Sequence, residues 1–222
     1  YVGSRQCTEV LIDALSKLEY RGYDSAGIAV FDNGEIKVAK SKGRLKDLEN
    51  KMEKEGTPNG FAGIGHTRWA THGEPSDVNS HPHSGERVTI VHNGIIENYK
   101  PLKEFLLSQG RVFQSETDTE VVAQLLDYYY DGNPLETIKK VMHELEGSFA
   151  LGIVFADFKD TVYAVRCESP LIVGVGENES FIASDVPAIL KYTKDYYLLE
   201  HGEIAVLNLS LIHISEPTRP EP

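Results

Sequence analysis

Residues 65–75 read GHTRWATHGEP, and a second polar segment at residues 91–99 reads VHNGIIENY. Each follows an apolar run that predicts a buried strand, over residues 61–65 and 88–92 respectively. Guanidinium, imidazole, hydroxyl and carboxamide groups therefore gather at the ends of two strands. Such a cluster can hold a small zwitterionic substrate and stabilise an oxyanion. A nucleophile is missing from both segments.

The rest of the chain predicts an α+β fold in which helices cover the outer faces of stacked antiparallel sheets. Residues 32–34 read DNG. Because Asn-Gly is a strong signal for a tight turn, the flanking runs 26–31 and 35–39 are predicted to form a hairpin. Helical spacing predicts helices at residues 8–20, 44–55, 99–109, 117–130 and 133–147. Short strands are predicted later in the chain, at residues 149–158, 161–166, 171–175, 180–183, 196–199 and 203–207.

The last residues, 210–222, contain three prolines and follow no periodicity that would continue the sheet. We interpret them as a non-native tail, and the alternative is a linker to a further domain that has been cut short. Residues 1–209 are accordingly expected to form one domain, because this length suffices to bury one sizeable core.

Composition argues against several classes of protein. The net charge is −12 and no lysine or arginine stripe stands out, so the electrostatic signature of a nucleic-acid-binding protein is absent. The longest apolar runs fall far short of the roughly 20 residues that span a bilayer. Two cysteines, Cys7 and Cys167, lie far apart and fit a reducing compartment. We therefore expect a cytoplasmic protein with neither nucleic-acid nor membrane partners.

Histidines raise the question of a metal site, because imidazole is the commonest transition-metal ligand. Five of the eight histidines fall between Gly65 and Asn93, namely His66, His72, His81, His83 and His92. Neither a helical His-x-x-x-His pair with a neighbouring glutamate nor a Cys-x-x-Cys pair accompanies them. The prediction is that the protein holds no metal and needs no cofactor.

Three residues of the polar segments have two interpretations each. Arg68 can grip a substrate carboxylate with both arms of its guanidinium, or it can form a surface ion pair. The only tryptophan, Trp69, is either a core anchor or a lid over the pocket. Asn93, with the glycine after it, is either a turn or half of an oxyanion hole, and local sequence physics favours the turn.

Two further residues invite assignment. Asp118 lies in Thr117-Asp118-Thr119-Glu120, which fits a helix capping box, so its carboxylate serves either the helix N-terminus or a substrate ammonium. Cys7 precedes an amphipathic helix and has no activating partner nearby in sequence. A buried thiol at the helix start is therefore favoured over a nucleophile.

Five blocks, taken together and in order, resemble the glutaminase domains of glutamine:fructose-6-phosphate aminotransferases, a branch of the class II glutamine amidotransferases. The similarity extends from Tyr1 to about Leu207, and the blocks are EYRGYDSAG (19–27), GHTRWATHG (65–73), HPH (81–83), VHNG (91–94) and SETDTE (115–120). The wording of the first two blocks resembles the sugar-phosphate branch rather than the other amidotransferase branches.

The resemblance implies an N-terminal-nucleophile fold, a four-layer αββα sandwich of two stacked antiparallel sheets. Members of the family begin with a cysteine in the segment Cys-Gly-Ile-Val-Gly. Its thiol attacks the side-chain amide of glutamine, ammonia leaves, and a glutamyl thioester is hydrolysed. The cysteine's own α-amine serves as the base, and its reference pKa of about 8 suits that task.

The resemblance also assigns positions of the glutamine pocket. Asn93 and Gly94 match the oxyanion hole. Arg68 matches the residue that holds the α-carboxylate of glutamine, and Asp118 matches the residue that pairs with its α-ammonium. Thr71 and His72 fall on further positions of the glutamine pocket. Trp69 falls on a position that borders the route by which ammonia leaves, and His81 and Arg21 fall on positions that support the closed site.

Tyr1 aligns just after the Cys-Gly-Ile-Val-Gly segment of the family, so the chain as given is expected to lack the nucleophile and to be inactive. By the same resemblance, the partners are L-glutamine and C-terminal sugar-isomerase domains that bind fructose 6-phosphate, in a homo-oligomeric parent protein. An alternative is a catalytically incompetent module that binds glutamine or regulates another domain. A metal-binding protein is a distant third.

Overall fold

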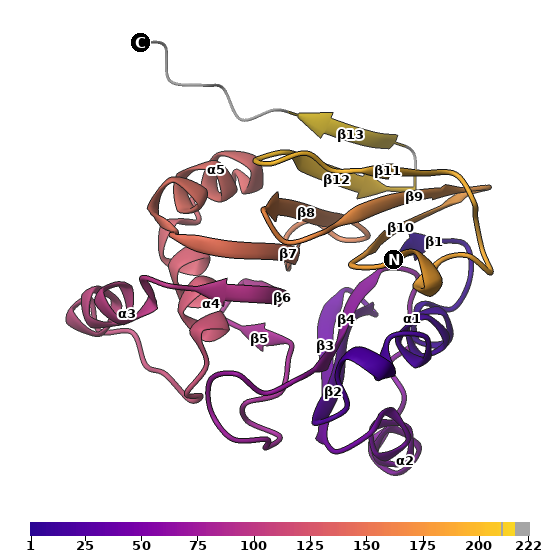
Figure 1. Ribbon diagram of the computed structural model, residues 1–222, viewed down its shortest axis with the longest axis horizontal. Coiled ribbons are helices and arrows are strands. Elements are labelled where there is room, and N and C mark those ends of the chain that lie inside the picture. Colours follow the sequence, from indigo (N-terminus) through magenta and orange to yellow (C-terminus); the bar gives the residue numbers. More distant parts are fainter. Residues whose placement is uncertain (210, 216–222) are drawn as a thin grey trace.

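Within residues 1–209 and 211–215, which the computed structural model describes, two stacked antiparallel β-sheets lie between two layers of helices (Figure 1). This order of layers confirms the predicted α+β fold and the αββα sandwich.

The first sheet consists of two hydrogen-bonded parts. One part has the order β3 (Glu35–Lys42), β2 (Ser25–Asp32), β4 (Gly63–Arg68). The other has the order β1 (Val2–Gly3), β10 (Glu179–Ala183), β9 (Ile172–Gly176), β11 (Tyr196–Leu198). An antiparallel bridge between Val2 and Ala62 joins β1 to the residue before β4. The short β1 therefore lies between β4 and β10, where it borders the candidate functional site.

The second sheet has the order β13 (Leu211–Ser215), β12 (Ile204–Asn208), β8 (Val162–Cys167), β7 (Gly147–Phe155), β6 (Val88–Ile96), β5 (His83–Ser84). The expectation that the sheet stops before residue 210 is wrong for residues 211–215, because β13 pairs with β12 along its whole length. Ile212 and Ile214 alternate with His213 and pack against the core between the sheets. The remainder of the predicted tail, residues 210 and 216–222, lies outside the described residues.

Helices cover the outer face of each sheet. The first sheet carries α1 (Cys7–Ser16) and α2 (Leu45–Glu55). A short 3-10 turn, η1 (Glu19–Arg21), follows α1 in the chain, and another, η2 (Val186–Ala188), follows β10. The second sheet carries α4 (Asp118–Tyr129), against which α3 (Tyr99–Ser108) and α5 (Pro134–Glu144) pack. Each predicted helix is thus present, with its ends shifted by a few residues. None of the helices in the described ranges is both long and apolar enough to cross a bilayer.

A separate apolar cluster fills each interface between layers. Strand β7 belongs to two of them: Phe149 and Leu151 face the helices, whereas Ala150 and Val154 face the other sheet. Because both faces of such a strand are buried, its sequence is a continuous apolar run rather than an alternation. This arrangement accounts for the long apolar stretch at residues 149–156.

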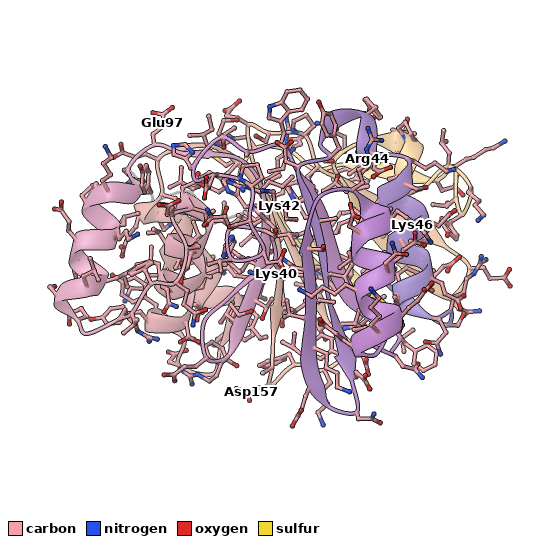
Figure 2. All side chains as sticks on the ribbon, turned by 90° about the horizontal axis from the view of Figure 1, so that it is seen from below. Lys40, Lys42, Arg44, Lys46, Glu97 and Asp157 are labelled. Atoms are coloured by element: carbon pink, nitrogen blue, oxygen red, sulfur yellow. The ribbon has the colours of Figure 1, made fainter. Side chains whose placement is uncertain are left out.

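Figure 2 shows basic side chains along one face, on β3 and at the start of α2. The labelled residues there are Lys40, Lys42, Arg44 and Lys46. Several lysines of this region are neutralised by carboxylates, in the pairs Lys37–Asp32 (2.8 Å), Lys46–Glu49 (3.4 Å) and Lys51–Asp77 (2.7 Å).

Candidate functional site

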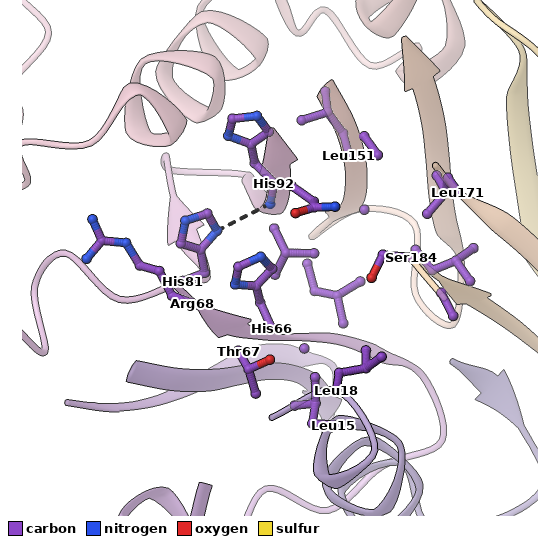
Figure 3. Close-up of a pocket in the computed structure, with 18 of the residues that line it drawn as sticks. Leu15, Leu18, His66, Thr67, Arg68, His81, His92, Leu151, Leu171 and Ser184 are labelled. Carbon is purple, nitrogen blue, oxygen red and sulfur yellow. Dashed lines mark hydrogen bonds between the residues drawn. The ribbon is translucent and has the colours of Figure 1, made fainter. Parts of the chain in front are cut away.

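A cavity of about 430 Å³ lies where β4, β6, β10 and α1 meet (Figure 3). Polar side chains line one end, among them His66, Arg68 and His92, and apolar side chains such as Leu15 and Leu171 line the other. All the positions that the resemblance assigned to a pocket line this one cavity: Arg21, Arg68, Trp69, Thr71, His72, His81, Asn93, Gly94 and Asp118. The fold thus brings together residues up to about half the chain apart.

Arg68 ends β4 with its guanidinium buried. Its Nη2 donates to the carbonyl oxygens of His72 and Gly73, the latter at 3.0 Å. Its Nη1 is buried and has no hydrogen-bond partner among the described residues. Desolvation lowers the pKa of Arg68, although Asp24 and Asp118 oppose this effect. The surface ion pair is therefore the wrong interpretation, and a buried donor is left free for a ligand.

Asp118 is the first residue of α4, and it is buried. One carboxylate oxygen, Oδ2, accepts a hydrogen bond of 2.9 Å from the backbone N–H of Ile96 on β6. The hydroxyl of Thr117 accepts from the N–H of Glu120, as the capping box predicts, but the Glu120 carboxylate binds the backbone N–H of Ser115 instead of returning to Thr117. Asp118 thus places a carboxylate in the cavity while it ties α4 to β6.

Asn93 and Gly94 lie inside β6, opposite Ala150 and Phe149 of β7. The prediction that they form a turn is wrong, because the strand continues through them to Ile96. Gly94 has φ +126°, and a Cβ atom there would lie 2.0 Å from the carbonyl oxygen of Ser148. Only glycine fits this position. Asn93 and Gly94 thus line the cavity from a strand that is paired with β7.

The loop after β4 carries Trp69, Thr71 and His72. Trp69 is 59% exposed and packs edge-on against Tyr23 with 5.7 Å between ring centroids, so it is not a core anchor. Because it also lines the cavity, it lies at the opening. His72 packs edge-on against Tyr99, and its buried Nδ1 has no partner in the described part of the chain.

Arg21 and His81 both line the cavity. Arg21, on η1, lies 3.5 Å from Asp185 Oδ2 and donates to the carbonyl of Ser184 at 3.4 Å, which links η1 to the loop after β10. His81 is buried, and its ring stacks on that of His66 with centroids 4.2 Å apart. Each residue therefore joins two elements that border the cavity.

The histidines form a buried cluster beside the polar end. Desolvation lowers the pKa of His66 and His83 to about 3 and that of His92 to about 4, and it holds the pKa of His81 well below its ordinary value. These rings are consequently neutral at pH 7. Within residues 1–209 and 211–215, no group of three or more potential ligands is arranged to hold a metal ion.

Thr119 is buried in the first turn of α4, and the sequence did not predict it as a site residue. Its hydroxyl oxygen lies 2.9 Å from His92 Nδ1 and 3.4 Å from His81 Nε2. The signal available in the sequence was its place next to Asp118 at a helix start, which alone does not distinguish it from an ordinary capping-box residue.

Cys7 is the first residue of α1 and is fully buried, as predicted for a thiol at the helix start. Burial raises the pKa of its thiol to about 12, an effect that the nearby N-terminal ammonium only partly offsets. A thiol with such a pKa is inert at neutral pH. Cys7 is therefore not the nucleophile of the cavity.

The apolar end of the cavity lies beyond the N-terminal end of β1, in the direction of that strand. The N-terminal ammonium of Tyr1 donates to the carbonyl of Gly63 at 2.8 Å, and the N–H of Gly63 donates to the carbonyl of Tyr1 at 2.9 Å. On the other side Val2 pairs with Ser180 of β10. The next residues along both neighbouring strands, Ile64 to Gly65 and Phe181 to Ile182, line the cavity.

Comparison with known proteins identifies relatives of the chain. Residues 66–191 match the family described as the glutamine amidotransferase domain. A glutamine–fructose-6-phosphate aminotransferase (isomerizing) of Caldanaerobacter subterraneus is 56% identical over 209 residues, which are 93% of this chain and 34% of that protein. The enzyme of the same name from Thermococcus kodakarensis is 50% identical over 214 residues, 93% of this chain and 35% of that protein. The chain thus spans about a third of the length of these relatives.

Solved structures resemble the fold. The glutamine phosphoribosylpyrophosphate amidotransferase of B. subtilis, complexed with ADP and GMP, superimposes with a TM-score of 0.84 at 24% identity and covers 98% of this chain and 48% of its own. A structure described as the allosteric regulatory enzyme of purine biosynthesis gives a TM-score of 0.86 at 25% identity, with the same coverage. From the family match and the shared fold it follows that the chain belongs to the glutamine amidotransferase domain family.

Proposed function

We propose that this chain is the glutamine-hydrolysing part of a glutamine–fructose-6-phosphate aminotransferase, whose ammonia converts fructose 6-phosphate to glucosamine 6-phosphate. One observation carries the glutamine part: the unpaired Nη1 of Arg68 and the carboxylate of Asp118 line the same cavity. An amino acid presents a carboxylate and an ammonium, and this cavity offers a guanidinium and a carboxylate to pair with them. The names and identities of the relatives support the destination of the ammonia.

The residues take the following roles. Arg68 holds the α-carboxylate of glutamine and Asp118 its α-ammonium. A thiolate attacks the side-chain amide carbon, and the oxyanion that forms is stabilised by the Asn93 carboxamide and the Gly94 N–H. The C–N bond then breaks, the nitrogen takes up a proton and leaves as ammonia, and water hydrolyses the remaining thioester. Glutamate is released and the free thiol is regenerated.

Residues around this centre complete the pocket. We assign Thr71 and His72 to further glutamine contacts, His72 through its unpaired Nδ1. Trp69 lies at the opening through which ammonia passes, and its exposure supports that role. His81 and Arg21 hold the closed form of the site, each through contacts that join two elements.

A residue that precedes Tyr1 in a longer chain supplies the thiol. The space that lies along the line of β1, between β4 and β10, supports this assignment, because an extended segment continuing β1 would enter the cavity there. Cys7 is inert, and Cys167 does not line the cavity. The 222 residues expressed as printed should therefore release no ammonia from glutamine.

The remaining parts of the proposal concern the longer protein. Sugar-isomerase domains would follow this domain and receive the ammonia, the whole would be a homo-oligomer, and it would act in the cytoplasm. The greater length of the relatives supports further domains. Both cysteines are free thiols, as suits a reducing compartment.

The decisive experiment restores Met-Cys-Gly-Ile-Val-Gly before Tyr1 and compares this protein with one carrying alanine in place of the added cysteine. Ammonia and glutamate should form in equal amounts with the cysteine protein only. Absence of product from both, with the circular dichroism of a folded protein, would refute the proposal and favour a glutamine-binding or regulatory module without activity.

A second experiment tests the zwitterion pocket in the same restored protein. Arg68→Ala and Asp118→Asn should each raise the KM for glutamine by about 10- to 100-fold, because each strands one charge of the substrate. Arg111→Ala is a matched control, since it removes an arginine whose ion pair with Asp127 lies outside the cavity. Unchanged KM values in both pocket variants would contradict the assignment.

A further inference from the structure

The first turn of α4 is tied to β6 at two points, and these points flank Asn93 and Gly94. The N–H of Ile96, beyond the pair, donates to Asp118 at 2.9 Å. His92, before the pair, contacts the Thr119 hydroxyl through Nδ1 at 2.9 Å. Asp118 and Thr119 are neighbours, so a single helical turn holds both ends of a short strand segment.

His81 links to the same place from the other side. The pairing of β5 with β6, His83 opposite Ile90, would put residue 81 opposite His92 if β5 continued. The strand instead consists of His83–Ser84. The N–H of His92 donates to the ring Nδ1 of His81 at 3.3 Å. A side chain therefore takes the place of a strand partner where β5 is absent.

These contacts fix where the protons lie. Nδ1 of His81 accepts a hydrogen bond, and because this buried ring is neutral, its proton must be on Nε2. That Nε2–H then donates to the Thr119 oxygen at 3.4 Å. The only acceptor left to the Thr119 hydroxyl proton among its contacts is Nδ1 of His92. His92 consequently carries its own proton on Nε2.

The result is a directed chain of hydrogen bonds with the threonine oxygen at its centre. It begins at the backbone N–H of His92, passes through the ring of His81 and the hydroxyl of Thr119, and returns to the ring of His92. All three side chains are at most 5% exposed, so water does not substitute for a missing member. The chain closes on the residue immediately before Asn93.

We propose that Thr119 is a positioning residue for glutamine hydrolysis, which closes this chain and thereby fixes the end of β6 that presents Asn93 and Gly94. The inference rests on the proposed function, because Thr119 acts on the oxyanion hole through His92. The separate bond from Ile96 to Asp118 does not depend on the threonine. Loss of Thr119 should therefore disturb the oxyanion hole more than the site of the substrate ammonium.

Kinetics of the restored protein test this split. Thr119→Val keeps the shape and removes the hydroxyl, and we expect kcat to fall by about tenfold, the equivalent of one buried hydrogen bond, with KM changed by less than about twofold. Thr119→Ser should recover most of the lost kcat. Thr137→Val is the matched control, because Thr137 is also buried and its hydroxyl donates to the carbonyl of Asn133, the N-cap of its own helix α5, at 2.8 Å.

An unchanged kcat in a folded Thr119→Val protein would overturn the inference, and so would a fall that the Thr137→Val control matches. Both results leave the proposed function intact as long as the restored parent releases ammonia. If the parent itself is inactive while folded, the proposed function fails, and the catalytic role of Thr119 fails with it.

A measurement without activity tests the chain itself. Long-range ¹⁵N–¹H correlation spectra of the printed 222-residue chain report which ring nitrogen of each histidine carries the proton. His81 and His92 should both carry it on Nε2, and Thr119→Val should alter the signals of these two rings while the Thr137→Val spectrum stays unchanged. A proton on Nδ1 of His92 in the parent would refute the assigned chain.

Discussion

The sequence contains the dipeptide Asn-Gly three times, and the copies at residues 33–34 and 93–94 adopt different structures. Asn33 and Gly34 have φ of +53° and +89° and connect β2 to β3, as a tight hairpin turn requires. Asn93 and Gly94 continue a strand. Both glycines use a positive φ, but only the second is surrounded by main chain, with the carbonyl of Ser148 in the way of any Cβ.

The difference teaches that a local signal decides structure only where the surroundings are open. At the hairpin the nearest atom to an added Cβ is the end of the Lys159 side chain, which can move. At the strand, β7 lies alongside and the first turn of α4 holds both flanks. Packing with distant segments therefore overrides the turn preference at the second copy and places a carboxamide in the cavity.

The largest effect should come from Gly94→Ala. A Cβ atom 2.0 Å from a backbone oxygen forces β6 and β7 apart. We expect a loss of more than about 4 kcal/mol in the free energy of unfolding, or no folded protein at all. Denaturant unfolding measures it, and a variant of nearly parental stability would show that the strand accommodates a side chain as the hairpin does.

Lowering the pH should destabilise the strand around Asn93-Gly94 before it destabilises the hairpin around Asn33-Gly34, and this is the next largest effect. The pKa values of His66, His83 and His92 are depressed below 6.5 in the folded protein by burial, so the unfolded chain binds more protons. Their contribution to stability is complete above pH 6.5 and is lost as the pH falls, by about 1.4 kcal/mol per pH unit for each histidine, until the folded pKa of about 3 to 4 is reached.

The hairpin responds in a lower range of pH. Lys37 lowers the pKa of Asp32 from 3.8, so the stability due to this pair persists until the pH falls below 3.8. Hydrogen exchange at pH 7 and pH 5.5, corrected for the intrinsic rates, should therefore show protection lost in residues 88–96 before residues 28–38. Equal loss in both segments would mean that the histidines do not govern the strand end.

Asn93→Ala should lower kcat of the restored protein by about 10²-fold with the fold intact, because one donor to the oxyanion is lost. Asn33→Ala is the matched control, since the side chain of this asparagine donates to the neighbouring Asp32 in the hairpin. Its kcat should equal that of the parent. Similar kcat values for both variants would remove Asn93 from the oxyanion hole.

Gly34→Ala should have the smallest effect. A residue with a Cβ atom at φ +89° is strained by about 1 to 2 kcal/mol, and the Lys159 side chain can yield. The melting temperature should fall by a few degrees, about 2 to 4 °C per kcal/mol for a chain of this size, without a change in kcat. A collapse comparable with that of Gly94→Ala would show that the hairpin is as enclosed as the strand.

Much of the fold could be predicted because periodicity is local. Spacing of apolar residues gave the helices over Cys7–Ser16 and Asp118–Tyr129, and the Asn33-Gly34 turn gave the hairpin. Strands of two residues, such as Val2–Gly3 and His83–Ser84, are too short for any period to appear. Residues 211–215 do alternate, but the neighbouring prolines obscured a strand that depends on β12 for its hydrogen bonds.

The candidate site, like the fold, was predicted only in part from the sequence. Residue type left two interpretations for Arg68 and two for Asp118, the resemblance assigned both to the glutamine pocket, and the structure places both in the lining of the cavity. The sequence left open whether Trp69 is in the core, and the structure places it at the surface. Thr119 was not identified at all, because its function depends on two histidines that are far from it in sequence and touch it only in the folded chain.

The sequence by itself determined the layers of this protein and the chemical groups available to its cavity, since apolar spacing and side-chain chemistry are properties of short segments. The tertiary structure alone decided which groups remain unpaired, which of the Asn-Gly pairs at residues 33–34 and 93–94 is a turn, and which hydrogen-bond partners His81 and His92 have. These properties depend on contacts between β4, β6 and α4, and no segment carries the information about its partners without the fold.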